Sequence, residues 1–384
     1  MKRKVCVAIT ARPSYSRIRT ALSAIRAHPE LELQLVVTAS ALLDRYGGAD
    51  KVIEAEGFRI DRRVYMIVEG ENLVTSAKST GFGLSELATV FDDLKPDMVV
   101  SIADRFETMA TALSAAYMNI PLVHVQGGEI TGSIDEKVRH AITKLADIHL
   151  VASNRAAERV IRMGEYPERV HVTGCPSIDV ARDAVAAPMV ANDIFDAYGG
   201  VGPKLDLSKG YLVVLQHPVT NEYMDARRQV EETLAAVVGS GLPALWLWPN
   251  VDAGSALLAR GLRVGRERQK LDNIHFFKNL PPEEFLRVLN ASTGIVGNSS
   301  VAIRECAYLG VPAVNIGTRQ SGRDRGANVI DVDYDRSQIR DAIRVAANIG
   351  HCHRDELYGD GQAGRRVAEV LAKAPLETVK RLAY

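Results

Sequence analysis

The chain has 384 residues, 47% of them hydrophobic, so it can bury more than one sizeable core. Lysine plus arginine and aspartate plus glutamate both total 47, so no overall charge favours nucleic acid or an anionic membrane as partner. The apolar run 5–9 is too short for a signal-peptide core, and no run approaches the roughly 18 apolar residues of a membrane helix. Four scattered cysteines show no disulfide or zinc spacing, which predicts a reduced, cytoplasmic protein.

Short β-branched runs alternate with longer helical patterns, as in parallel α/β proteins. Strands are predicted at residues 5–10, 33–38, 98–102, 122–125 and 148–152 and, after a glycine-rich segment, at 211–215, 244–248, 274–276, 294–297 and 313–316. Helices are predicted between them, for example at 225–238, 282–289 and 300–309. We therefore predict two doubly wound domains, residues 1–178 and 179–362. A last helix within 363–384 could pack back on the N-terminal domain.

Polar residues follow the predicted strands in both halves of the chain. In the first half these are Arg12, Asp104, Arg105, Gln126 and Glu129, and in the second half His217, Asn250, Asn298, Ser299 and Ser300. In open parallel sheets, ligands bind outside the carboxyl ends of the strands. We therefore expect one ligand in a cleft shared by the two domains.

The segment from His124 to His140 is the most informative part of the sequence. A strand runs into two glycines, which places Glu129 on a tight turn, and a helix then opens at a capping box formed by Ser133 and Glu136. Asp135 lies in the first helical turn, one turn before Arg139. Carboxylates held beside an anion site suit chemistry on a phosphorylated or nucleotide-linked substrate.

Each candidate also has a structural interpretation. Ser299 and Ser300 could bind an anion or only cap a helix, and Glu305 could face a ribose or be a solvated surface acid. Arg319 could meet a phosphate or be an ordinary surface arginine. Asp104 and Arg105 could form an ion pair that closes their loop.

The histidines divide in a similar way. His217 precedes a proline, which fixes it on a rigid turn, although a lone histidine is usually structural. His124 and His140 are expected to make local hydrogen bonds. The tract from His351 to His353 lacks a credible fourth ligand, so no metal site is predicted.

The motifs taken together resemble those of a known family. They are Ala11-Arg12-Pro13-Ser14-Tyr15-Ser16, Asp104-Arg105-Phe106, Gly127-Gly128-Glu129, Ser133-Ile134-Asp135-Glu136, Arg139-His140-Ala141-Ile142-Thr143-Lys144, Gln216-His217-Pro218-Val219-Thr220, Pro249-Asn250-Val251-Asp252-Ala253-Gly254-Ser255, Gly297-Asn298-Ser299-Ser300 and Gly317-Thr318-Arg319-Gln320. This collinear set, which covers nearly the full chain, resembles the hydrolysing UDP-N-acetylglucosamine 2-epimerases of sialic-acid biosynthesis, including the epimerase half of the mammalian bifunctional enzyme.

The resemblance implies two Rossmann-like domains in the GT-B arrangement, with the active site in the cleft between them. It implies conversion of UDP-N-acetylglucosamine and water to N-acetylmannosamine and UDP, without a metal or nicotinamide cofactor. A homodimer or a dimer-built homotetramer would fit the family.

The resemblance also assigns roles to residues. It implies nucleotide contacts at Arg12, Ser16, Phe285, Ser299, Ser300, Glu305 and Arg319, with Phe285 stacking on the base and Glu305 binding the ribose hydroxyls. Further substrate-binding residues are predicted at Gln126, Arg139, Asn250 and Asn298. It implies catalytic roles for Asp104, Asp135 and His217, with Arg105 and Glu129 close by.

One departure from the family pattern bears on the substrate. Many relatives have a carboxylate where this chain has Gln126, and an amide cannot act as a base. Either Asp135 or Glu129 does that work, or the substrate is a UDP- or GDP-linked 2,4-diacetamido sugar on the way to legionaminic acid, with Gln126 donating a hydrogen bond to its acetamido group. Three rival functions would use the same fold: a non-hydrolysing epimerase, a GT-B glycosyltransferase and a non-catalytic nucleotide-sugar sensor.

Overall fold

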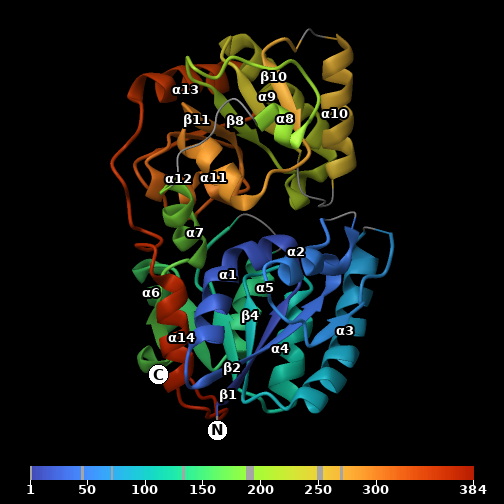
Figure 1. The fold of residues 1–384 in the computed structure, drawn as a ribbon, viewed down its shortest axis with the longest axis vertical. Coiled ribbons are helices and arrows are strands. Elements are labelled where there is room, and N and C mark those ends of the chain that lie inside the picture. The colour runs from blue at the N-terminus through green and yellow to red at the C-terminus, as the bar shows by residue number, and fades with distance from the viewer. Residues whose placement is uncertain are drawn as a thin grey trace. The chain divides into compact units, whose positions relative to one another are not determined.

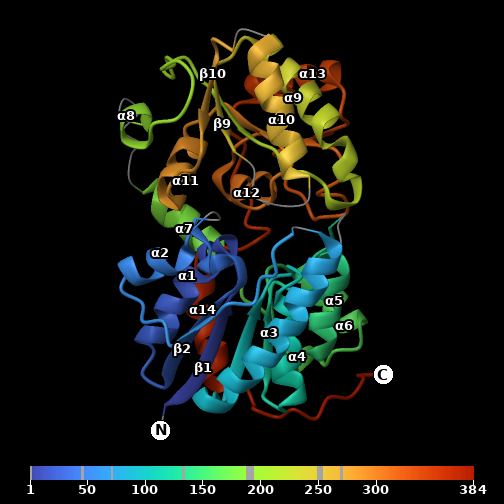
Figure 2. The ribbon, with the colours of Figure 1, turned by 90° about the vertical axis from the view of Figure 1, so that its right-hand side faces the viewer.

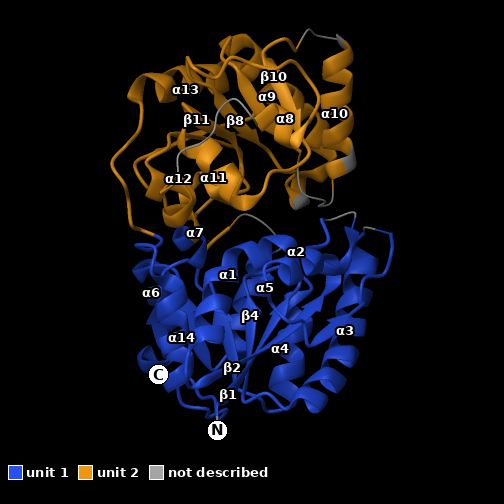
Figure 3. Ribbon diagram, viewed as in Figure 1, with its two compact units in different colours: residues 1–129, 134–179, 358–384 blue, residues 130–133, 180–357 orange. Residues whose placement is uncertain are grey.

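The chain divides into two units, each built around its own parallel sheet (Figure 3). The computed structural model describes residues 2–44, 47–70, 72–131, 135–186, 194–248, 254–268 and 271–384. Unit 1 comprises Met1–Glu129, Ile134–Asp179 and Tyr358–Tyr384, and unit 2 comprises Ile130–Ser133 and Val180–Leu357. Within the described residues, every helix is too short or too polar to cross a bilayer.

The sheet of unit 1 has seven parallel strands in the order β3-β2-β1-β4-β5-β6-β7 (Figure 1). The strands are β1 (Arg3–Ile9), β2 (Leu31–Thr38), β3 (Arg62–Val64), β4 (Met98–Ile102), β5 (Leu122–Val125), β6 (Ile148–Val151) and β7 (Val170–Val172). The central strands are buried on both faces, so their sequences are nearly continuous apolar runs.

Helices cover both faces of this sheet (Figure 2). Helices α1 (Arg12–Ala27), α2 (Ala49–Ala55) and α14 (Ala363–Lys373) share one core with the sheet, while α3 (Leu73–Leu94), α4 (Thr108–Tyr117) and α5 (Asp135–Leu145) share the core on the other face. The remaining helical segments are η1 (Ala39–Leu42), α6 (Asn154–Arg162), η3 (Pro167–Arg169) and α7 (Pro176–Val185), which runs on into unit 2. Helix α14 therefore adds a C-terminal segment to the core of the first unit.

Unit 2 also contains a parallel sheet, which has six strands in the order β10-β9-β8-β11-β12-β13. The strands are β8 (Leu212–Leu215), β9 (Ala244–Leu247), β10 (Ile274–Phe277), β11 (Gly294–Gly297), β12 (Ala313–Ile316) and β13 (Val329–Val332). Helices α9 (Ala226–Ser240), α10 (Ser255–Arg268) and α13 (Arg336–Ile349) pack on one face. The other helical segments are α8 (Ile194–Tyr198), η4 (Thr220–Asp225), α11 (Pro282–Asn290), η5 (Ser300–Ala302) and α12 (Glu305–Leu309).

The prediction of two Rossmann-like domains is confirmed, and all ten predicted strands exist with ends shifted by at most a few residues. The sequence missed β3, β7 and β13, which are short edge strands with partly exposed residues. The single helix predicted at 300–309 is wrong, because the chain there forms the short turns η5 and α12. No long helix dipole is therefore available to an anion at Ser299 and Ser300.

Candidate functional site

The carboxyl ends of β4 and β5 place the first group of predicted residues. The hydrogen bonding of each strand continues for one residue past its end. The Ala103 N–H donates to the Val125 carbonyl (3.0 Å), and the Gln126 N–H donates to the Leu150 carbonyl (2.9 Å). Ala103 and Gln126 then adopt the left-handed conformation, with φ of 64° and 68°. For residues with a Cβ this conformation costs of order 1 kcal/mol, so the surrounding packing must enforce the turn.

The two glycines of the β5 turn are required by close packing. A Cβ on Gly128, where φ is 77°, would lie 2.3 Å from the Ala156 carbonyl oxygen of α6, which no side chain could tolerate. A Cβ on Gly127 would lie 2.9 Å from both His124 Nδ1 and Thr143 Oγ1. The turn is therefore pressed against α5 and α6, and the next residue, Glu129, is only 2% exposed.

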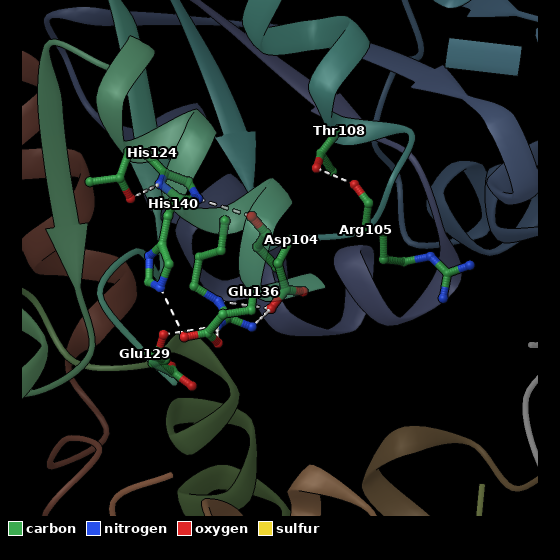
Figure 4. A network of polar contacts seen from close by, with 10 residues as sticks. Asp104, Arg105, Thr108, His124, Glu129, Glu136 and His140 are labelled. Carbon is green, nitrogen blue, oxygen red and sulfur yellow. Dashed lines mark hydrogen bonds and ion pairs between the residues drawn. The ribbon is translucent and has the colours of Figure 1, made fainter. Parts of the chain in front are cut away.

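The buried guanidinium of Arg139 contacts several polar groups at this edge, where Figure 4 shows Asp104, Glu129 and Glu136 near one another. Arg139 of α5, 1% exposed, donates from Nε to Asp104 Oδ2 (3.0 Å) and pairs with the same oxygen through Nη2. Its Nη1 donates to the Glu129 carbonyl oxygen (2.8 Å) and to Glu136 Oε2 (2.9 Å). Asp104, Glu129 and Arg139, which come from three of the motifs, therefore meet at this edge.

Electrostatics keep the Arg139 guanidinium charged. Burial on its own would lower the pKa of Arg139, but the negative charges of Asp104, Glu129 and Glu136 raise it above the usual arginine value. The guanidinium therefore stays cationic and holds several carboxylates near one another. Such a cluster can stabilise a developing positive charge or accept a proton.

Other predicted residues of unit 1 lie elsewhere on the same sheet edge or beside it. The Arg105 side chain points away from the cluster (Figure 4) and donates to Glu107 Oε1 (2.8 Å). Asp135 is the first residue of α5 and is half-buried. Ser133, the predicted cap before it, is outside the described residues.

Helix α1 carries two more of the predicted residues. Arg12 is its first residue, and a Cβ on Gly47 would lie 2.6 Å from the Arg12 Nη1 atom, so the guanidinium lies along the backbone of that glycine. Burial lowers the pKa of Arg12. Ser16 donates its hydroxyl to the Arg12 carbonyl (3.3 Å), one helical turn earlier.

Gln126 is buried and its amide is only partly used. Its Nε2 donates to the sulfur of Cys175 (2.9 Å), and Cys175 Sγ lies 3.0 Å from the Ser177 hydroxyl. Among the residues that the structure describes, Gln126 Oε1 has no hydrogen-bond partner. The predicted role of Gln126 as a hydrogen-bond donor stays a prediction, and its Oε1 offers an acceptor as well.

The local hydrogen bonds expected for His124 and His140 are confirmed. His124 Nε2 donates to the Ala103 carbonyl (2.9 Å) and its Nδ1 accepts from Thr143 Oγ1 (3.1 Å), while His140 Nε2 contacts Glu136 Oε1 (2.9 Å). Complete burial lowers the pKa of His124 from 6.5 to about 3, so its imidazole is neutral at physiological pH. His124 thus fixes the turn before Asp104.

This burial predicts a pH-dependent stability. In the unfolded chain His124 binds a proton below about pH 6.5, whereas in the folded protein it binds one only below about pH 3. The folded protein therefore loses stability as the pH falls below about 6.5. Glutamine can donate to Ala103 and accept from Thr143 without titrating. When the pH is lowered from about 7.5 to about 5, the unfolding free energy of wild type and of His124→Gln should both fall. We expect the fall to be about 2 kcal/mol smaller in His124→Gln. Urea unfolding at both pH values measures this.

The control for this prediction is His353→Gln, because His353 is exposed. It should lose as much stability on acidification as wild type. Equal losses in wild type and His124→Gln would contradict the proposed neutral, buried state of His124.

In unit 2, Asn298 connects the loops that follow β8 and β11. Its Oδ1 accepts from the His217 N–H (2.7 Å) and its Nδ2 donates to the His217 carbonyl (2.8 Å). The Asn298 carbonyl accepts from Arg319 Nη1 (3.2 Å) and Gln320 Nε2 (2.9 Å). Predicted residues from three separate motifs, His217, Asn298 and Arg319, therefore meet at one place.

The glycine before Asn298 allows this approach. Gly297 has φ of 141°, and a Cβ there would lie 2.1 Å from the Leu215 carbonyl oxygen of β8. Ser299 accepts from the Val301 N–H (3.4 Å), so it caps η5 as its structural interpretation predicted. Its role toward an anion stays a prediction.

The remaining predicted residues of unit 2 lie on its short helices and turns. Ser300 begins η5, and Phe285 of α11 is half-buried. Glu305 begins α12 and is 8% exposed, so the interpretation as a solvated surface acid is wrong. Its Oε2 is buried without a hydrogen-bond partner in the described part of the chain. Asn250 is outside the described residues.

Sequence reasoning missed two residues that the structure joins to the site. Glu136 was assigned only to a capping box, yet it lies three residues before Arg139 and four before His140, the helical spacings at which side chains meet, and it pairs with both. Gln320 had no such signal, because its bond to Asn298 depends on how two loops fold.

The chain is similar in sequence to a family of known proteins over nearly its whole length. The sequence model of the UDP-N-acetylglucosamine 2-epimerase family matches residues 23–372. The chain is 32% identical to the UDP-N,N'-diacetylbacillosamine 2-epimerase (hydrolyzing) of Legionella pneumophila over 98% of each chain. It is 31% identical to the UDP-N-acetylglucosamine 2-epimerase of Neisseria meningitidis over 97% of this chain and 95% of that protein.

A solved structure is similar in fold. The crystal structure of UDP-GlcNAc 2-epimerase from Neisseria meningitidis bound to UDP-GlcNAc aligns with a TM-score of 0.80 at 17% identity, covering 96% of this chain and all of that chain. The family match covers the strands of both sheets from β2 onward and includes the Asp104, Arg139 and Asn298 motifs. The resemblance inferred from those motifs is confirmed, and the chain belongs to the UDP-N-acetylglucosamine 2-epimerase family.

Proposed function

We propose that this protein is a hydrolysing 2-epimerase that converts UDP-N-acetylglucosamine and water to N-acetylmannosamine and UDP. The observation that carries the proposal is the gathering of Asp104, Glu129 and Glu136 around the buried Arg139. Membership of the family supports the substrate class, and the name of the Legionella relative supports the hydrolysing branch. The product would serve the synthesis of sialic or related nonulosonic acids.

The chemistry explains why carboxylates are needed. The hydrogen on carbon 2 of the sugar is barely acidic, so the bond from carbon 1 to UDP must break early, and the ring acquires oxocarbenium character. UDP leaves with the bonding electrons, a carboxylate accepts the proton from carbon 2, and a 2-acetamidoglucal results. Water then adds its hydroxyl to carbon 1, while a proton reaches carbon 2 on the opposite face. The sum is N-acetylmannosamine plus UDP.

The side chains divide these tasks in the proposed mechanism. Asp104, Asp135 and Glu129 stabilise the cationic ring and move the protons, because an amide at Gln126 cannot. Arg12, His217 and Arg319 stabilise the departing pyrophosphate, and Ser299 adds a hydroxyl donor. Glu305, with its buried oxygen lacking a described partner, would accept hydrogen bonds from the ribose, and Phe285 would stack on the base.

A second substrate is favoured by one observation. Gln126 Oε1 is a buried acceptor without a described donor, and an additional acetamido N–H at carbon 4 of the sugar would supply one. The Legionella relative is named for such a 2,4-diacetamido sugar. We therefore propose UDP- or GDP-linked N,N'-diacetylbacillosamine as the alternative substrate of the same reaction.

Product analysis tests both proposals. Purified protein would be incubated with UDP-N-acetylglucosamine, UDP-N-acetylgalactosamine and UDP- and GDP-linked N,N'-diacetylbacillosamine, and followed by proton NMR. We expect free nucleoside diphosphate and the free 2-epimerised sugar in equal amounts, without an acceptor. Preference for UDP-N-acetylglucosamine would remove the diacetamido alternative.

Three results would contradict the hydrolysing reaction. An intact UDP-N-acetylmannosamine product would identify a non-hydrolysing epimerase. Turnover that requires a sugar or lipid acceptor would identify a glycosyltransferase. Tight binding of nucleotide sugars without turnover would identify a sensor.

A further inference from the structure

The C-terminal end of α5 is held by a charged cluster that the proposed reaction does not use. After α14 the chain continues without regular secondary structure along unit 1 toward α6 (Figure 2). It is anchored there, because Arg169 pairs with Glu377 (2.8 Å) and the Ala383 N–H donates to the Gly164 carbonyl (3.1 Å). Lys380 lies between these two anchors.

The ammonium group of Lys380 caps α5. It donates to the carbonyls of Thr143 (3.3 Å) and Ala146, which lie in the last turn of α5 and just beyond it. These carbonyls have no partner within the helix, and a cation at a helix C-terminus is favourable. A segment about 240 residues away in sequence therefore closes the helix that begins with Asp135.

Glu165 holds the ammonium group in place. Its carboxylate, 5% exposed, accepts from Lys380 (2.6 Å), Lys144 (2.6 Å) and His149 (3.0 Å). Burial alone would raise the pKa of Glu165, but the hydrogen bonds from His149, Lys144 and Lys380 bring it down to about 2. Burial lowers the pKa of His149, so this ring donates as a neutral group. The carboxylate thus fixes both lysines with one full negative charge.

Hydrogen bonds also connect this end of α5 to the loop that carries Asp104. Thr143, whose carbonyl accepts from Lys380, bonds through its hydroxyl to His124 Nδ1 (3.1 Å). His124 Nε2 in turn donates to the carbonyl of Ala103, the residue before Asp104 (2.9 Å). A continuous chain of hydrogen bonds therefore runs from the C-terminal segment to the loop of a proposed catalytic carboxylate.

We propose that Lys380 is a positioning residue, which fixes α5 and, through Thr143 and His124, the Asp104 loop in the geometry that the reaction needs. The proposal rests on the proposed function. A positioning role and a purely structural role for Lys380 predict different results. Loss of a positioning contact lowers turnover more than it weakens substrate binding or lowers global stability.

The test uses point variants of the full chain. Lys380→Met keeps the length of the side chain and removes the charge, and Lys380→Arg keeps the charge. Arg381→Met is the matched control, because Arg381 is the next residue, is basic and is exposed. We expect Lys380→Met to lower kcat about tenfold or more with KM changed less than about twofold. Lys380→Arg should recover kcat to within about threefold of wild type, and Arg381→Met should equal wild type.

A second measurement does not depend on activity. Amide hydrogen exchange of α5 should accelerate about tenfold or more in Lys380→Met, with α14 and β4 as internal references that stay unchanged. Exchange that accelerates equally in all three elements, or kcat unchanged in Lys380→Met, would overturn the proposal. A wild-type protein without turnover on any nucleotide sugar would instead refute the proposed function, and the exchange result would then still decide whether Lys380 fixes α5.

Discussion

Replacing Asp104 with asparagine is expected to lower kcat at least about a hundredfold. The substitution keeps the shape of the side chain and one hydrogen-bond acceptor for Arg139 but removes the negative charge. In the proposed reaction that charge stabilises the cationic sugar ring or receives the proton from carbon 2. Release of UDP from UDP-N-acetylglucosamine, measured at saturating substrate, reports the change directly.

This variant should also be less stable, because the Arg139 guanidinium stays buried with one charged partner fewer. A hydrogen bond to a charged group contributes about 1.5–3 kcal/mol, so unfolding free energy should fall by that order. The measured rate must therefore be divided by the concentration of folded protein. Asp92→Asn, on the exposed face of α3, is the control and should match wild type in both measurements. A folded Asp104→Asn protein with near-normal kcat would remove Asp104 from the mechanism.

Asp135→Asn is expected to lower kcat by a similar factor, at least about a hundredfold. Asp135 is half-buried in the first turn of α5, where its negative charge also interacts favourably with the helix dipole. Because both carboxylates act in the proposed reaction, the two variants should have similar effects on turnover. Measuring kcat and urea unfolding for both variants separates catalysis from folding.

The control for Asp135 is its neighbour in sequence. Lys137→Met, exposed on the same turn of α5, should leave kcat within about twofold of wild type. If Asp135→Asn retains wild-type turnover, Asp135 is removed from the mechanism, and Asp104 and Glu129 are left for proton transfer.

The central sheets could be predicted from sequence because their strands are buried on both faces. A strand such as β4 is apolar at nearly every position, which leaves little ambiguity. The edge strand β3 could not be found, since its sequence, Arg62-Arg63-Val64, has only one buried residue. Periodicity also suggested one helix after Gly297, but it cannot reveal where a helix breaks into the short turns η5 and α12.

The candidate site was predictable to the level of loops but not of side-chain contacts. Parallel strands bring their carboxyl ends to one edge, so the positions of Asp104 and Glu129 followed from strand prediction alone. The directions of the side chains did not follow. Arg105 adjoins Asp104 in sequence yet points to Glu107, whereas Arg139, distant in sequence, reaches Asp104. Left-handed turns at Ala103 and Gln126 decide such directions, and non-glycine residues give no warning of them.

The bond between Asn298 and His217 constrains how this protein can evolve. The asparagine contributes its side chain, but its partner contributes only main-chain atoms, which are the same for almost every amino acid. A substitution at position 298 therefore cannot be rescued by changing the side chain at position 217. We therefore expect fewer accepted substitutions at position 298 than at position 217. At position 217, only the role of the imidazole itself limits substitution.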